Sequence, residues 1–327
     1  MAQTDPTKFQ LLVKHNELTQ QVATQLYDVL STCEVVLLCD DSDSMNKSIT
    51  EEGTDPFAVK RSTRWLELKK LASVIIDFVT AINPNGLDIY FLNRPTLSNV
   101  INMDDLQGTF NVLPNGGTPL SEKINQIYYD KRHVHQNLLI VVVTDGEPTG
   151  GKDPRGELYN TLNNKRYNVH ISVAECTDNA EDMAYLDDWD GIIKNFDNTD
   201  DYREELQRVK SAQGPQFKFD YTDYVIKILL ATFVKWYFNL DQTKVSRNPS
   251  GIVYNKRIQT APIMQSTQII QSIPMAQPQP QSIPVQSIPV QSIPMGPPLS
   301  NPSQQPVIIR QTNANLPNQK NKCCSIL

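Results

Sequence analysis

The sequence lacks the features of a secreted or membrane-spanning protein. Its five cysteines form no disulfide framework, because Cys33, Cys39 and Cys176 lie in or beside apolar runs and the other two adjoin near the end. The first residues show no charged-then-apolar signal pattern, and no apolar run approaches the ~20 residues of a membrane-spanning helix. We therefore expect an intracellular, reducing location.

Acidic residues are missing from the last quarter of the chain. All 36 lie at or before Asp241, together with 23 of the 30 basic residues, so this part carries a net charge of −13 and the remainder +7. Thirteen of the 22 prolines follow Asp241, among many Gln, Ser and Asn residues. The first part can bury a sizeable core, whereas the second has little to bury. A domain this acidic is a poor nucleic-acid binder, and we predict no such partner.

Apolar and amphipathic segments alternate along the folded part. We expect strands at 34–40, 87–92, 138–144, 167–174 and 192–196, and helices at 9–30, 63–82, 119–130, 180–190, 201–211 and 220–240. This alternation predicts an α/β fold with a doubly wound, mostly parallel sheet flanked by helices. We predict four regions: a helical segment packed on the domain (1–30), the domain (31–241), a disordered linker rich in Pro and Gln (242–322), and a lipidation terminus (323–327).

One polar run directly follows a strand of the buried type. The apolar run 35–39 ends at Asp40, and Ser42 and Ser44 follow at intervals of two residues. The carboxyl edge of an open α/β sheet is where ligands bind. A carboxylate and two hydroxyls are hard oxygen donors, suited to Mg²⁺ rather than to zinc. The run therefore predicts a magnesium-dependent binding site.

Two later segments complete a pattern with this run. Thr118 lies on a glycine-rich turn before a helical stretch, and Asp145 directly follows the apolar run 138–144. The three segments resemble the von Willebrand factor A (vWA) family, whose metal site is called MIDAS. Its pattern is Asp-x-Ser-x-Ser, then a distant Thr, then a distant Asp after a hydrophobic strand. The resemblance covers roughly residues 31–240 and implies the vWA, Rossmann-like fold.

The resemblance also implies a set of metal ligands and a mode of binding. The set is Asp40, Ser42, Ser44, Thr118 and Asp145. The two serines are the expected direct ligands, whereas the aspartates act directly or through water. In the family, an acidic side chain of a protein partner completes the coordination of the ion. We expect Mg²⁺, with Mn²⁺ or Ca²⁺ as alternatives, and a shift of the last helix (220–240) as the site rearranges.

The same run leaves an enzymatic alternative. Asp41-Ser42-Asp43 fits the Asp-x-Asp of a haloacid-dehalogenase-like phosphotransferase, in which the first aspartate attacks phosphorus and the second is an acid or base. Met45 stands where that pattern has Thr or Val, and no convincing downstream lysine with paired aspartates follows. We therefore predict no enzymatic activity and expect Asp41 and Asp43 at the exposed rim of the metal site.

A second alternative is a nucleotide site. Residues 146–152 match G-x-x-x-x-G-K after a strand, but Asp153 replaces the Ser or Thr that binds Mg²⁺. Pro154 favours a new turn over a helix begun in the loop. We interpret the segment as a glycine-rich loop beside the metal site and predict no nucleotide.

A third cluster of charge lies on a predicted short helix. Asp187, Asp188 and Asp190 are consistent with a second cation site or with a solvated charged face, and the pattern favours the solvated face.

The part after the domain repeats the unit Gln-Ser-Ile-Pro between residues 271 and 294. Proline in each copy prevents a helix or a central strand, so we predict an extended, disordered tether, with a linear docking motif as the alternative.

The last four residues, Cys324 to Leu327, fit the prenylation pattern C-a-a-X, with leucine favouring geranylgeranyl. Cys323 adds a candidate for palmitoylation, and two lysines precede it. The sequence thus predicts a protein anchored by lipid on the cytosolic face of a membrane. A structural tether with a vestigial metal site is the remaining alternative.

Overall fold

The computed structural model describes residues 6–50, 61–177, 179, 183–247 and 249. The chain divides into two compact units, 1–260 and 261–327, and the described residues all belong to the first. The predicted linker repeats, Cys323 and Cys324 lie outside the described residues.

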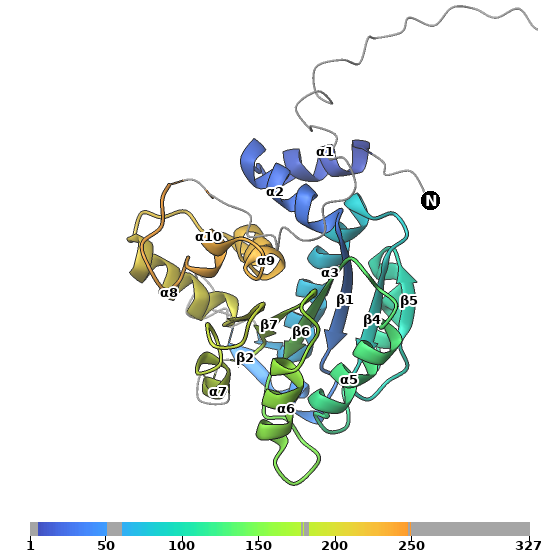
Figure 1. Cartoon of the computed structure of the whole chain (residues 1–327). Helices are drawn as coiled ribbons and strands as arrows, with labels where there is room; N and C mark the ends of the chain where they lie inside the picture. The colour runs from blue at the N-terminus through green and yellow to red at the C-terminus, as the bar shows by residue number, and fades with distance from the viewer. Residues whose placement is uncertain (1–5, 51–60, 178, 180–182, 248, 250–327) are drawn as a thin grey trace, which may run out of the picture. The chain divides into compact units, whose positions relative to one another are not determined.

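A six-stranded mixed sheet forms the centre of the described unit (Figure 1), in the order β5-β4-β1-β6-β7-β8. The strands are β1 (Cys33–Cys39), β4 (Leu87–Phe91), β5 (Leu97–Val100), β6 (Asn137–Thr144), β7 (Val169–Glu175) and β8 (Phe196–Thr199). All neighbours are parallel except β4 and β5. The chain leaves β1 toward β4 and later returns to β6 on the other side, so β1 and β6 meet where the strand order reverses. Such a switch point is where open α/β sheets bind ligands.

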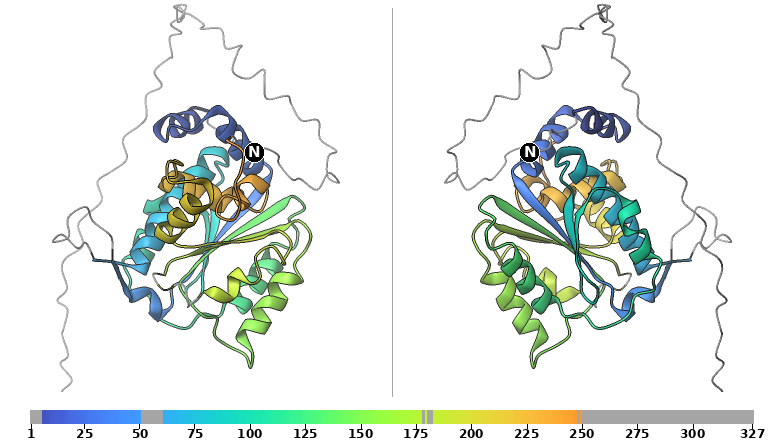
Figure 2. Two further views of the ribbon diagram at one scale, coloured as in Figure 1. Left: turned by 90° about the vertical axis from the view of Figure 1, so that its left-hand side faces the viewer. Right: turned by 90° about the vertical axis from the view of Figure 1, so that its right-hand side faces the viewer.

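Helices cover both faces of the sheet (Figure 2). Alternate residues of a strand point to opposite faces, so Leu37 and Val141 pack toward one layer, and Leu38 and Val142 toward the other. The first layer contains α2 (Gln20–Leu30), α3 (Arg64–Ile82) and α9 (Tyr221–Leu230). The second contains α5 (Leu120–Asp130), α6 (Pro154–Asn163) and α7 (Ala184–Asp187). The predicted fold class is confirmed.

Two predicted helices are each divided in the structure. The segment predicted at 9–30 forms α1 (Pro6–His15) and α2, because Glu17 adopts a left-handed φ of 51° and the Thr19 side chain caps α2 by accepting from the Val22 N–H. The segment predicted at 220–240 forms α9 and a short α10 (Lys235–Phe238). The single long helices were wrong in both places.

Other elements were missed or displaced. The last strand begins at Phe196, where the prediction ended, and α6 begins at Pro154, where a turn was expected. Helix α8 (Tyr202–Gln213), in contrast, agrees with the helix predicted at 201–211. The elements that were not predicted are β2 (Ser48–Thr50), β3 (Arg61–Thr63), α4 (Gln107–Phe110) and the 3₁₀ turns η1 (Asp43–Asn46) and η2 (Met103–Leu106). Strand β5 pairs irregularly with β4, with a register shift between Leu87 and Ile89, and Asn99 within it has a φ of 57°.

A buried ion pair joins α8 to α9. Lys227 and Glu205 are both fully buried, and Lys227 Nζ lies 2.8 Å from Glu205 Oε1 and 3.2 Å from Asp241 Oδ1. Burial lowers the pKa of a lysine, but the neighbouring carboxylates outweigh it and raise the pKa of Lys227. The ammonium therefore stays charged inside the domain and links the last helices to the core.

None of the helices in the described part of the chain has the length and hydropathy needed to cross a membrane.

Candidate metal centre

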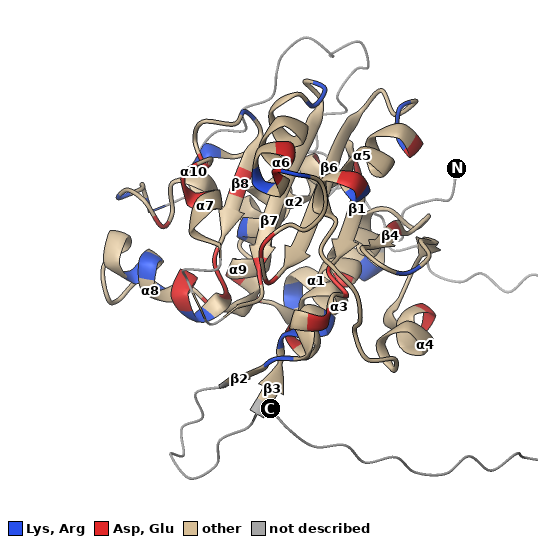
Figure 3. Ribbon diagram, turned by 90° about the horizontal axis from the view of Figure 1, so that it is seen from below, with Lys and Arg blue, Asp and Glu red and all other residues tan. Residues whose placement is uncertain are grey.

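Four of the five predicted ligands converge at the carboxyl edge of the sheet. Asp40 follows β1 and Asp145 follows β6, and the two strands are hydrogen-bonded neighbours. The Asp40 N–H donates to the Val143 carbonyl at 2.9 Å, which continues the ladder up to the site. Figure 3 views the domain from this end, where acidic and basic segments intermingle.

The two serine hydroxyls link the aspartates. Ser42 Oγ lies 2.9 Å from Ser44 Oγ, and Ser44 Oγ donates to Asp145 Oδ1 at 2.7 Å. Adjacent oxygens of an octahedral Mg²⁺ site at 2.0–2.1 Å from the ion are about 3 Å apart, and those of a Ca²⁺ site are more widely spaced. The three oxygens therefore have the spacing of neighbouring ligands around a small divalent ion.

Hydrogen bonds to both carboxylate oxygens orient the Asp40 side chain. Oδ1 accepts from the Ser42 N–H at 2.8 Å, and Oδ2 accepts from Thr144 Oγ1 at 2.6 Å. Burial, together with the charge of Asp145, raises the pKa of Asp40 to about 6. Two buried carboxylates at one site repel each other, and a divalent cation between them relieves that repulsion. This donor set fits Mg²⁺.

Thr118 lies on a loop that is hydrogen-bonded to the other two loops of the site, the one that follows β1 and the one that follows β6. The Asp43 N–H donates to the Gly116 carbonyl at 3.0 Å, and the Thr149 N–H donates to the Thr118 carbonyl at 2.8 Å. Thr149 Oγ1 in turn accepts from the Thr118 N–H at 2.7 Å. Thr118 is buried beside the other two loops, and metal ligation by its hydroxyl stays a prediction.

Asp41 does not lie at the exposed rim, so that expectation was wrong. It is fully buried, its Oδ1 accepts from the Asn93 N–H at 2.7 Å, and its Oδ2 lies 3.1 Å from Arg94 Nε. Arg94 also donates to the carbonyls of residues 109, 112 and 113. Asp41 thus fastens the first loop to the loop that leads to Thr118, whereas Asp43 is exposed.

Sequence reasoning also missed Arg64, which pairs with a predicted ligand. Its Nη1 lies 2.9 Å from Asp145 Oδ2, and both side chains are buried. An arginine at the first residue of a helix carries no motif, so no signal in the sequence indicated this contact.

A second acidic group occupies the neighbouring strand ends. One carboxylate oxygen from each of Glu175, Asp187 and Asp200 lies within 4.8 Å of the others, so the group could hold a cation. Asp187 thus lies with Glu175 and Asp200, and not with Asp188 and Asp190, the residues with which the sequence analysis grouped it. Arg208 pairs with Asp187 and Asp200 at 3.2 and 2.6 Å. Burial raises the pKa of Glu175 to about 8.

The two alternatives from sequence find no support in these contacts. Asp41, the aspartate that would attack phosphorus, is buried and engaged by Asn93 and Arg94. In the glycine-rich loop, the Asp153 carboxylate caps α6 by accepting from the Gly156 N–H at 3.1 Å. A carboxylate already occupies the helix N-terminus that a phosphate would need.

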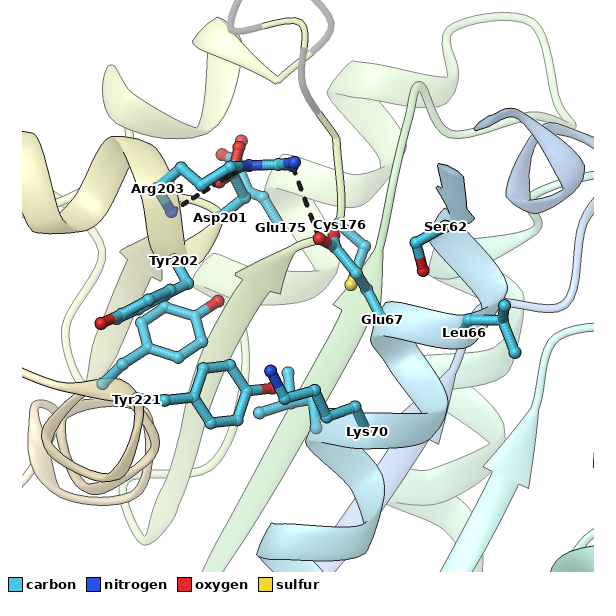
Figure 4. Close-up of a pocket in the computed structure, with 12 residues that line it drawn as sticks. Ser62, Leu66, Glu67, Lys70, Glu175, Cys176, Asp201, Tyr202, Arg203 and Tyr221 are labelled. Atoms are coloured by element: carbon cyan, nitrogen blue, oxygen red, sulfur yellow. Dashed lines mark hydrogen bonds and ion pairs between the residues drawn. The ribbon is translucent and has the colours of Figure 1, made fainter. Parts of the chain in front are cut away.

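A cavity of about 390 Å³ lies between α3, the end of β7 and the helices α8 and α9 (Figure 4). Arg203 crosses its wall, 3.1 Å from Asp201 and 3.5 Å from Glu67. Tyr221 lies opposite, with Lys70 Nζ 4.0 Å from its ring centroid. The predicted metal ligands do not line this cavity.

Comparisons with known proteins find similarity at the level of structure. No family model matches the sequence, and no curated protein matches it. Among solved structures, the crystal structure of the manganese-loaded Plasmodium vivax TRAP protein matches with a TM-score of 0.34 and 14% sequence identity. The match covers 54% of this chain and 72% of that chain.

Proposed function

We propose that this chain is a vWA-type, Mg²⁺-dependent protein-binding module of the adhesion or scaffold kind. The observation that carries the proposal is the linked set of oxygens from Ser42, Ser44 and Asp145, with Asp40 beside it at the switch point of the sheet. These hard oxygen donors suit Mg²⁺, with Mn²⁺ or Ca²⁺ as alternatives.

The residues would bind a partner by leaving one face of the site open. Asp40, Ser42, Ser44 and Asp145 would hold a Mg²⁺ ion, which would supply an electrophilic position for an Asp or Glu of the partner. Ser42 and Ser44 contribute neutral oxygens, so they do not reduce the attraction for an incoming carboxylate. Arg94 binds Asp41 and the carbonyls of residues 109, 112 and 113, and so holds the neighbouring loop in place. We expect no catalysis at this site.

The proposal places the module on the cytosolic face of a membrane, and its support comes from the sequence. Cys324 would carry the prenyl group, and Cys323 a palmitoyl group as the second signal that stable anchoring needs. A Cys324→Ser variant should lose membrane association in a fractionation of cells. Retained association would remove the anchor from the proposal.

Affinity capture from cells tests the binding function. The wild-type chain should retain partners in Mg²⁺ and release them in EDTA, whereas Ser42→Ala and Asp145→Ala should retain none. Ser211→Ala is the matched control, because that hydroxyl is exposed on α8 and bonds only the Gln207 carbonyl among the described contacts. Capture that is unchanged by Ser42→Ala and by EDTA would favour a tether with a vestigial metal site.

A further inference from the structure

Arg64 places a buried positive charge against the proposed metal centre. It is the first residue of α3 and is 3% exposed. Its Nη1 donates to Asp145 Oδ2 at 2.9 Å and to the Asp145 carbonyl at 3.3 Å, and its Nη2 donates to Thr177 Oγ1 at 2.7 Å. Its N–H donates to the Lys47 carbonyl at 3.1 Å, just beyond the first loop. One guanidinium therefore ties α3 to the ends of β6 and β7.

A buried arginine at the start of a helix needs stabilising contacts such as these. The N-terminus of a 19-residue helix carries the positive end of the helix dipole, which favours an acidic side chain over a basic one. Burial also removes the guanidinium from water, and only a paired carboxylate with further acceptors offsets that loss. Asp145 supplies the carboxylate, so the two side chains depend on each other.

Asp145 divides its carboxylate between two neighbours. Oδ1 accepts from Ser44 Oγ at 2.7 Å on the side of the serine hydroxyls, and Oδ2 accepts from Arg64 at 2.9 Å. A divalent ion bound beside the serine hydroxyls would be attracted to the carboxylate of Asp145, as the guanidinium of Arg64 is. The ion and the guanidinium, both positively charged, would therefore repel each other across this carboxylate.

We propose that Arg64 is a built-in competitor of the divalent ion for Asp145, an inference that rests on the proposed function. Its effect is to weaken binding of the ion. Arg64 reduces the summed charge of Asp40 and Asp145 from −2 to −1, so the two carboxylates attract a divalent ion less strongly than they would alone.

Mn²⁺ titration of the purified full chain tests the competition. We expect Arg64→Met to lower the Kd for Mn²⁺ about tenfold or more, because the repelling charge is gone and Asp145 is released. Arg203→Met makes the same chemical change at a residue that pairs with Glu67 and Asp201, and it should leave the Kd within about twofold. Arg64→Lys keeps the charge and should bind Mn²⁺ less tightly than Arg64→Met.

A second readout covers loss of stability. Without metal, Arg64→Met should melt at a lower temperature than wild type, since Asp145 is left buried and unpaired, and Mn²⁺ should raise its melting temperature by more than it raises that of wild type. If the variant is unfolded without metal, refolding on addition of Mn²⁺ below the wild-type Kd supports the competition, and failure to refold counts against it.

The outcomes separate this inference from the proposed function. Equal or weaker Mn²⁺ binding by Arg64→Met, with binding abolished by Ser44→Ala, overturns the competition and leaves the metal site in place. Absence of Mn²⁺ binding in wild type, Arg64→Met and Arg64→Lys overturns both.

Discussion

Replacing Lys227 by methionine should destabilise the domain more than any surface substitution. The ammonium is fully buried, 2.8 Å from Glu205 and 3.2 Å from Asp241, so its loss leaves carboxylates buried without their counter-ion. Removing one partner of a buried ion pair costs about 3–5 kcal/mol. With an unfolding entropy of about 2.1 cal/mol/K per residue over roughly 240 folded residues, this lowers the melting temperature by about 6–10 °C.

Thermal unfolding followed by circular dichroism at neutral pH measures this effect. Lys235→Met is the matched control, because Lys235 is exposed on α10, and it should change the free energy of unfolding by less than about 0.5 kcal/mol. Adding Glu205→Gln to Lys227→Met should recover part of the loss, since an uncharged amide is easier to bury than an unpaired carboxylate. A decrease below about 2 °C in Lys227→Met would refute the reasoning that this pair links the last helices to the core.

Three further substitutions test other contacts. Glu175→Gln should flatten the pH dependence of stability. Burial raises the pKa of Glu175 from 4.5 to about 8 in the folded state, so between these pH values the folded state binds more protons than the unfolded state. The stability of the wild type should therefore fall as pH rises from 4.5 through 8, and urea titrations at several pH values would record this fall. Asp41→Asn should destabilise the chain by about 1–2 kcal/mol in urea, because Arg94 loses a charged partner but keeps its carbonyl acceptors, and an effect near zero would contradict the role given to that pair. Gly116→Ala should cost about 1–3 kcal/mol, since a Cβ there would lie 2.4 Å from Asn93 Oδ1 at a φ of 123°, and unchanged stability would show that the loop relaxes freely.

The central strands could be predicted because their signal is local. The run from Leu138 to Val143 is apolar throughout, as a strand covered on both faces must be, and the ligand pattern follows directly from the ends of such runs. Strand β8 carried no such signal. It reads Phe-Asp-Asn-Thr, and its polar residues are buried because Asp197 accepts from Thr199, and Asn198 donates to Glu175.

The partners of the site residues could not be predicted, because tertiary contacts decide them. Asp41 was expected in solvent from its variable position in the motif, yet Asn93 and Arg94, from a loop about fifty residues away, surround it. Arg64 reaches Asp145 across 81 residues of sequence. The division of the first helix, in contrast, had a local signal that was missed, since Thr19 is a residue type typical of a helix N-cap.

The irregular pairing of β5 with β4 affects how readily molecules of this protein could associate through the edge of the sheet when they are crowded together. An edge strand that is long and flat offers its free N–H and C=O groups as a template to another chain, which can begin fibril growth. Here that edge is four residues long, shifts register against β4 and turns at Asn99 into a left-handed conformation. A neighbouring molecule would find no straight ladder to extend at β5, so crowding alone should not propagate the sheet through this edge.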